Sequence, residues 1–442
     1  RPLQLVDGRA YAATWLWCRV TRTETQDRKT GKVVVLNPPQ VQTERRLFVI
    51  RDDGKTFGDG GDHSLEELGF EVRLAEPPPG QLGLSARGVK AYRAGYRPLA
   101  ASVLEQVASV YDYYLDFSRS LGTQGQMCRL SACLSIATYL ADAFSVVGYA
   151  WPNGEKGSGK TKWASVWANT SYLGMVVTCG GSFAALRDLA EYGAALAFDD
   201  AENLSDPKRS DPDKRALLLA GNRRGVQIPL KEPVGDKWQT RWVNAYAPRA
   251  FTAINAPDPV LHSRSIVIPL VRTGDRERAN RDPGKLEHWP LDAGQLRDDL
   301  WQLALSLLPE AELVWCELDS ETETAGRDLE PWRAALATSR LLDRHGASSL
   351  EDDVRAVMRS YFEERSENVT GDRQRAVAVA MVRHIEKLVE NEIGRRLSDV
   401  VDVADVRTSC SEGWTFSAQD IAATLKLLAS DAEDEGIDAT DW

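Results

Sequence analysis

Residues 154–161 read Gly-Glu-Lys-Gly-Ser-Gly-Lys-Thr, which is the pattern G-x-x-x-x-G-K-T. Its glycines let the backbone wrap a phosphate at dihedral angles that side chains disfavour. Backbone N–H groups and the N-terminus of a following helix then supply a positive field. An apolar strand is expected at 145–150 and a helix at 160–169. The pattern therefore predicts a phosphate-binding P-loop inside a strand–loop–helix unit.

Each loop residue has an expected role in binding a nucleotide. Lys160 is placed for the β- and γ-phosphates, and the hydroxyl of Thr161 for Mg²⁺. The residues expected to line the nucleotide are Gly154, Glu155, Lys156, Gly157, Ser158, Gly159, Lys160 and Thr161. ATP and Mg²⁺ are the expected cofactors. The six cysteines and five histidines are scattered, which argues for a reducing cytoplasm and against any other metal centre.

A pair of acids follows an apolar strand expected at 194–198. Asp199 ends that strand and is expected to hold Mg²⁺ through water. Asp200 lies forty residues after Lys160 (200 − 160) and is expected to polarise the attacking water as general base. Glu202 is the rival for this second role. Two adjacent acids favour hydrolysis over a small-molecule kinase, which needs no activated water.

Two later elements complete the candidate catalytic set. The segment R-A-F-T-A-I-N is a strand that ends in Asn255, which would lie between the P-loop and Asp200 and orient water. The alternative is a turn asparagine before Pro257. Arg264 precedes a final strand at 266–270, on the face where ring ATPases present an arginine to the neighbouring subunit's nucleotide. The alternative for this arginine is a surface salt bridge.

The segment 223–246 is predicted to form a hairpin around the turn E-P-V-G-D-K. Lys231 and Lys237 near the turn would neutralise phosphates, and Trp238 would stack on bases or sugars. The alternative is a structural hairpin in which Trp238 and Trp242 fill a core. A net charge of −11 is unfavourable for DNA binding, but local clustering of positive residues decides this question.

The order of these elements resembles the superfamily 3 helicases and related AAA+ ATPases. In particular, it resembles the helicase modules of primase-helicases from plasmids, phages and integrative elements. The segments that carry the resemblance are G-E-K-G-S-G-K-T, A-L-A-F-D-D-A-E, A-G-N-R-R-G-V, R-A-F-T-A-I-N and S-R-S-I-V-I-P-L. The close match covers roughly residues 144–275. One departure is that the hairpin has no unambiguous single lysine at its tip.

The resemblance implies an α/β fold, an AAA+ (ASCE) P-loop NTPase core with a mostly parallel sheet. It implies a homo-oligomer, a hexameric ring with ATP at the subunit interfaces and hairpins that step along single-stranded DNA. The residues that would act within one subunit are Lys160, Thr161, Asp199, Asp200 and Asn255, whereas Arg264 would act on its neighbour. A separate primase or polymerase would be a partner, and no membrane is expected because no apolar run approaches ~20 residues. The alternative function is a non-translocating AAA+ switch in assembly or anti-phage defence.

The chain is too long for a single core, so several domains are expected. The predicted domains are a β-rich N-terminal domain at 1–80, a helical collar or linker at 81–143, the ATPase core at 144–275 and a helical C-terminal domain at 276–442. The last helix, capped by Ser417, belongs either to a winged-helix-like module or to a simple packing helix.

Overall fold

The chain has a mixed α/β fold with two main sheets, seen in a computed structural model. The structure describes residues 1–26, 31–58, 61–72, 74, 83–178, 182–202, 212–235, 237–321, 326 and 329–364. One compact unit spans Arg1–Met358, and the expected C-terminal helix with its cap at Ser417 lies outside the described residues. The expected divisions at residues 80, 143 and 275 fall inside this unit and stay predictions.

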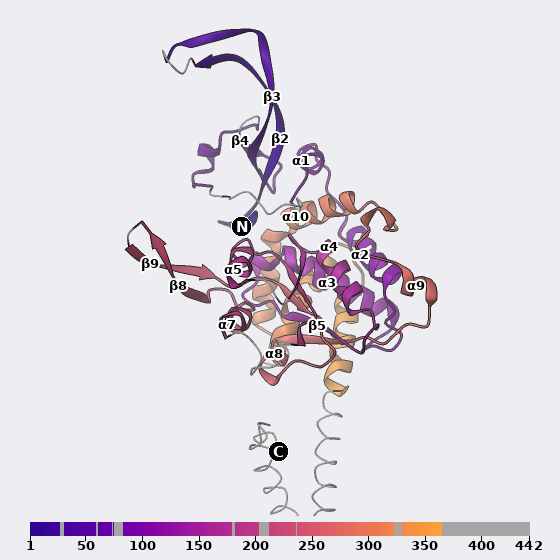
Figure 1. Cartoon of the computed structure of the whole chain (residues 1–442). Coiled ribbons are helices and arrows are strands. Elements are labelled where there is room, and N and C mark those ends of the chain that lie inside the picture. The colour runs from indigo at the N-terminus through magenta and orange to yellow at the C-terminus, as the bar shows by residue number, and fades with distance from the viewer. Residues whose placement is uncertain are drawn as a thin grey trace, which may run out of the picture. The chain divides into compact units, whose positions relative to one another are not determined.

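The N-terminal part forms an antiparallel sheet of order β1-β2-β3-β4. Its strands are β1 (Leu3–Val6), β2 (Arg9–Gln26), β3 (Val33–Arg51) and β4 (Thr56–Gly58). The inner ends of β2 and β3 are buried, whereas their outer parts continue as a two-stranded ribbon that extends away from the body (Figure 1). The β-rich character predicted for this region is confirmed.

Helices from two parts of the chain pack against one another. The N-terminal group is α1 (Ala86–Arg93), α2 (Ala100–Tyr114) and α3 (Gln124–Tyr139). The later group is α10 (Ala293–Asp319), α11 (Arg333–Arg344) and a helix that begins at Leu350. Buried positions in α2 recur every three or four residues, as expected of a helix with one face in the core. Helix α3 is buried along nearly its whole length, as its small and apolar side chains predict.

The second sheet is parallel, has five strands and carries the candidate site. Its order is β11-β5-β10-β7-β6. The strands are β5 (Tyr149–Asn153), β6 (Met175–Thr178), β7 (Leu196–Asp199), β10 (Arg249–Phe251) and β11 (Ser265–Pro269). The connecting helices are α4 (Lys160–Thr170), α5 (Phe183–Glu191), α7 (Pro212–Ala220), α8 (Pro259–His262) and α9 (Arg276–Asn280).

The strand expected at 145–150 is misplaced, because the observed strand starts four residues later at Tyr149. Residues before it pair with the segment that leads into the hairpin. Val146 forms an isolated bridge with Arg223, and the N–H of Val147 donates to the carbonyl of Asn222 at 2.9 Å. Apolar composition alone does not distinguish residues that pair within the parallel sheet from residues that pair with the segment before the hairpin.

The order of the strands determines which loops meet. Strand β10 comes late in the chain but lies between β5 and β7. The carboxyl ends of parallel strands share one edge of a sheet. The loop after β5, the acid at the end of β7 and the residues after β10 therefore gather at that edge, as the sequence pattern predicts.

Candidate functional site

The glycine loop, residues 154–161, leaves β5 and opens α4. Gly154 has a φ of 149° and Gly159, the N-cap of α4, has a φ of 100°. A Cβ atom on Gly154 would lie 2.1 Å from the carbonyl oxygen of Leu270, just past β11. Glycine is thus required here both by backbone conformation and by the close approach of the neighbouring strand.

The ammonium group of Lys160 is hydrogen-bonded to the backbone of this loop. The side chain is buried, and its ammonium donates to the carbonyls of Gly154 at 2.7 Å and Glu155 at 3.0 Å. Two polar atoms at this end of β5 and in the loop, the Oδ1 of Asn153 and the Oγ of Ser158, are buried without a hydrogen-bond partner among the described residues. Buried polar atoms of this kind also occur elsewhere in the described chain, and they take their partners from water, an ion or a ligand.

The acid at the end of β7 connects three elements through hydroxyl groups. Thr161, in the first turn of α4, donates to the Oδ1 of Asp199 at 3.2 Å. Thr252, which follows β10, donates to the same oxygen at 2.5 Å. Thr252 also accepts from the N–H of Asp200 at 3.2 Å. The sequence reasoning missed Thr252, although the T-A-I-N segment placed a hydroxyl at the end of β10.

Asp200 and Glu202 differ in what surrounds their carboxylates. Asp200 is exposed and holds a left-handed backbone conformation with a φ of 56°, which costs an L-residue roughly 1–2 kcal/mol. Its turn is held in place by Thr252, whose carbonyl accepts from the N–H of Ala201 at 2.7 Å. Glu202 accepts instead from the N–H of Ile254 at 3.0 Å. Glu202 thus supports the loop after β10, and Asp200 presents the more exposed acid.

Asn255 lies on the same edge of the sheet as the glycine loop. Its carbonyl accepts from the indole N–H of Trp151 in β5 at 3.1 Å. A parallel bridge between Asn153 and Ala253 holds the preceding residues beside the end of β5. The side chain of Asn255 is exposed. Its backbone therefore lies beside β5, and the role of its side chain in orienting water stays a prediction.

Arg264 lies at the edge of the sheet opposite to the glycine loop, beside the amino end of β5. Its carbonyl accepts from the N–H of Tyr149, the first residue of β5, at 2.9 Å. Gly154 comes five positions after Tyr149 along β5, which corresponds to about 16 Å at 3.3 Å per residue. The guanidinium donates to the carbonyl of Val260 at 2.5 Å. Arg264 is therefore remote from the glycine loop of its own chain, and a contact with a neighbouring subunit stays a prediction.

The predicted hairpin consists of β8 (Gln227–Val234) and β9 (Lys237–Asn244) and projects from the body beside α5 and α7 (Figure 1). Trp238 is 68% exposed and Trp242 is 59% exposed. The alternative that these two side chains fill a core is therefore wrong, because more than half of each side chain is exposed. Lys231 and Lys237 are exposed too.

One face of the hairpin is tied to α5 through charges. Arg241 of β9 pairs with Glu191 at the end of α5 and with Glu232 of β8. Arg187 of α5 also pairs with Glu232 at 3.1 Å. These contacts orient the hairpin relative to the sheet.

A buried arginine anchors the base of the hairpin. Arg249, the first residue of β10, is 1% exposed. Its guanidinium donates to the carbonyls of Leu217 at 2.9 Å, Leu218 at 3.1 Å and Ala245 at 2.8 Å, and to the Tyr149 hydroxyl at 3.1 Å. These four partners are neutral oxygens from α7, the hairpin exit and β5. Arg249 thus holds both ends of the hairpin segment on the sheet.

A cavity of about 310 Å³ opens beside the glycine loop. Part of its wall is Gly157, Ser158 and Gly159, together with Lys162 of α4; the rest comes from the end of α2 and from the segment after β11. Thr273 in that segment donates to the carboxylate of Asp116 at 2.7 Å. The volume is in the range of small-molecule pockets. Because its walls come from segments far apart in the chain, no local sequence pattern indicates it.

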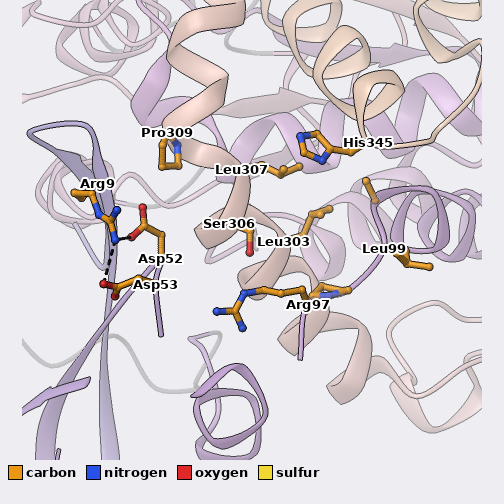
Figure 2. A pocket seen from close by; sticks show the side chains of 12 residues that line it. Arg9, Asp52, Asp53, Arg97, Leu99, Leu303, Ser306, Leu307, Pro309 and His345 are labelled. Atoms are coloured by element: carbon orange, nitrogen blue, oxygen red, sulfur yellow. Dashed lines mark ion pairs between the residues drawn. The ribbon is translucent and has the colours of Figure 1, made fainter. Parts of the chain in front are cut away.

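A larger cavity of about 590 Å³ lies between the N-terminal sheet and α10 (Figure 2). At its rim, Arg9 pairs with Asp52 at 2.7 Å and Asp53 at 3.2 Å. A hydrogen bond from Arg51 lowers the pKa of Asp53 to about 2. None of its lining residues belongs to the glycine loop or the acid pair. Because these rim charges already pair with one another, we assign no site here.

Comparison with models of known protein families and with curated proteins finds no match. Within the described residues, no group of three or more His, Cys, Asp or Glu is arranged to hold a metal ion. Among the helices of that same part of the chain, none is long and apolar enough to span a membrane. Inference of function therefore depends on the geometry of the glycine loop, the acid pair and the hairpin.

Proposed function

We propose that the chain is an ATP-hydrolysing P-loop NTPase of the AAA+ type that acts on DNA as a ring-forming helicase or translocase. The observation that carries the proposal is the shared carboxylate oxygen of Asp199, which accepts from Thr161 and Thr252. Thr161 at the start of α4 and Asp199 at the end of β7 are joined by one hydrogen bond. Together they would hold Mg²⁺, Thr161 directly through its hydroxyl and Asp199 through water. Mg²⁺ prefers oxygen ligands and takes its others from phosphates and water.

The residues around the glycine loop fit a nucleotide. Within the described residues the Ser158 hydroxyl lacks a hydrogen-bond partner and is free to donate to a phosphate oxygen, and the cavity beside the loop has room for a base. When bound, ATP with Mg²⁺ supplies the phosphoryl group that is transferred to water. Lys160 would exchange its two carbonyl partners for phosphate oxygens, which are stronger acceptors for an ammonium group.

The acids and the loop after β10 would handle water. Asp200, exposed beside Asp199, would accept the proton of the attacking water. The Thr252 hydroxyl would hold Asp199 and Asp200 in a fixed position relative to each other. Asn255 would orient the water. Arg264, remote from its own glycine loop, suits a role at the site of a neighbouring subunit in the proposed ring.

The experiment is ATP turnover by the full chain at low salt, with and without single-stranded DNA. We expect DNA to stimulate turnover severalfold, and Lys160→Ala to abolish turnover under both conditions. Lys285→Ala, an exposed lysine outside the site, is the matched control and should behave as wild type. No ATP turnover in the wild type would refute the NTPase proposal. Turnover that ignores DNA would refute the motor and favour a non-translocating switch.

A further inference from the structure

The cavity beside the glycine loop is enclosed by three parts of the chain. One wall is the loop itself, at 157–159. A second wall is the end of α2, where a side-chain carbon of Leu115 lies 3.4 Å from the position that a Cβ atom on Gly159 would take. The third wall is the segment 271–280 after β11, which we call the strap. A nucleoside attached to phosphates on the loop therefore has this cavity as the adjoining space.

Hydrogen bonds fasten the strap to α2 and α4. The ammonium group of Lys162 donates to the carbonyls of Arg278 at 2.7 Å and Ala279 at 2.8 Å. The guanidinium of Arg278 donates in turn to the carbonyl of Leu115 at 3.0 Å. These bonds hold the strap in place, so the cavity exists before a ligand enters, as is usual for sites that bind small molecules.

Asp116 is the only acid among the described residues that line this cavity. Its Oδ2 accepts from the hydroxyl of Thr273 at 2.7 Å, and its Oδ1 accepts from the N–H of Ser118 at 3.0 Å. Burial raises the pKa of this carboxyl, but hydrogen bonds from Ser118 and Thr273 and the positive charge of Arg278 lower it, and the pKa lies below its ordinary value. Asp116 is therefore an ionised carboxylate in a fixed orientation.

An ionised carboxylate discriminates between the edges of nucleobases. It accepts hydrogen bonds and donates none, and its two oxygens offer about four lone pairs. The contacts with Thr273 and Ser118 use two of them. The others suit an N–H donor and repel a carbonyl oxygen. Adenine and cytosine carry an amino group where guanine and thymine carry a carbonyl oxygen. The wall at Asp116 is therefore complementary to a base with an amino group.

We infer that Asp116 selects the base of the nucleotide by accepting a hydrogen bond from the amino group of adenine. This inference rests on the proposed function, since the glycine loop contacts phosphates and leaves the choice of base open. Guanine and uracil are disfavoured because each presents a carbonyl oxygen to the carboxylate. Cytosine has the amino group on a smaller ring, which buries less apolar surface against Leu115 and Val271. Thr273 is a positioning residue that orients the carboxylate.

The test compares steady-state hydrolysis of ATP and of purine riboside triphosphate by the full chain with Mg²⁺. The second nucleotide differs from ATP only in lacking the amino group. Its KM should be about 10- to 100-fold higher, because the carboxylate loses a charge-assisted hydrogen bond. The KM for GTP should be at least as high. The kcat should change less than about twofold, since the base is remote from the phosphoryl group that reacts.

Variants of Asp116 should remove this discrimination. In Asp116→Leu the KM for ATP should rise to within about twofold of the KM for purine riboside triphosphate. Asp116→Asn keeps the shape of the side chain and can donate from its amide, so the ratio of the GTP and ATP KM values should fall at least fivefold. Thr273→Val should lower the same ratio severalfold with kcat unchanged. Each ratio compares two nucleotides on one variant, so it does not depend on the fraction of protein that is folded.

The matched control is Glu277→Gln, which neutralises an acid of α9 that is 87% exposed and does not line the cavity. It should keep the KM ratios of wild type within about twofold. A fall in the ratio as large as in Asp116→Asn would overturn the assignment, because a general change of charge would then explain it.

The outcomes separate this inference from the proposed function. If wild type hydrolyses ATP and purine riboside triphosphate with equal KM, selection by Asp116 is refuted and the NTPase stands. If the KM rises for dATP but not for purine riboside triphosphate, the carboxylate contacts the ribose and base selection is refuted. If no triphosphate is hydrolysed, the proposed function fails and this inference fails with it.

Discussion

Replacing Arg249 with methionine tests whether the hairpin base depends on one buried cation. The guanidinium makes four hydrogen bonds to neutral oxygens and is 1% exposed. The Arg249→Met variant keeps a long side chain but removes every donor. The carbonyls of Leu217 and Ala245 would then stay buried without this partner.

The magnitude follows from these contacts. Hydrogen bonds to a charged group contribute about 1.5–3 kcal/mol each, and part of this is offset because the variant no longer buries a charge. We expect a net loss of about 3 kcal/mol in the free energy of unfolding. This corresponds to a fall of about 5 °C in the midpoint of thermal unfolding for a unit of this size.

Thermal unfolding followed by circular dichroism measures the effect. Arg249→Lys should be nearly as destabilised, because an ammonium on a shorter reach does not replace the planar fork of a guanidinium. Arg223→Met is the matched control: its side chain is 56% exposed and pairs with Glu330, so about 1 kcal/mol or less is expected. An Arg249→Met midpoint within 1 °C of wild type would refute the reasoning.

Three further predictions concern the site, the proposed assembly and the cysteines. Thr252→Val removes one hydroxyl contact to the acids, so ATP turnover measured by steady-state kinetics should fall about tenfold; an unchanged rate would contradict its role. Mixing Arg264→Ala with Asp200→Ala subunits should restore part of the turnover, and no recovery at any ratio would exclude action between subunits. Burial raises the pKa of the Cys128 thiol to about 12, so at pH 8 a thiol reagent should label the exposed Cys316 and spare Cys128, as mass spectrometry would show.

The sequence predicts the parts of the site that depend on local pattern. The glycine loop, Lys160 and the acids at 199–200 are encoded by residue type and by a neighbouring apolar run, and the structure places them on the expected elements. The strand expected at 145–150 was misplaced because Val146 pairs with Arg223, a partner 77 residues away (223 − 146).

Other features depend on how distant segments meet. Thr252 contacts Asp199 only because β10 enters the sheet between β5 and β7, which no local pattern specifies. The two faces of the hairpin depend on the pleat and on register. Lys237 and Trp238 are neighbours in β9 and point to opposite faces in any register, whereas a shift of one residue between β8 and β9 would move Lys231 away from the face of the indoles. Because Lys237 and Trp238 are adjacent in the sequence, they were expected to share one surface. The pleat of the strand instead directs their side chains to opposite faces.

Strand β10 is only three residues long, yet it has a different contact at each end. Arg249 at its start holds the hairpin base, and Thr252 just after its end touches Asp199. The distance between them is about 10 Å, spanned by a strand paired on both sides. A movement of Asp199 and Asp200 would therefore be transmitted along β10 to the base of the hairpin. Because the hairpin strands extend about 26 Å from this base, a rotation at the base would displace the tip in proportion to that length.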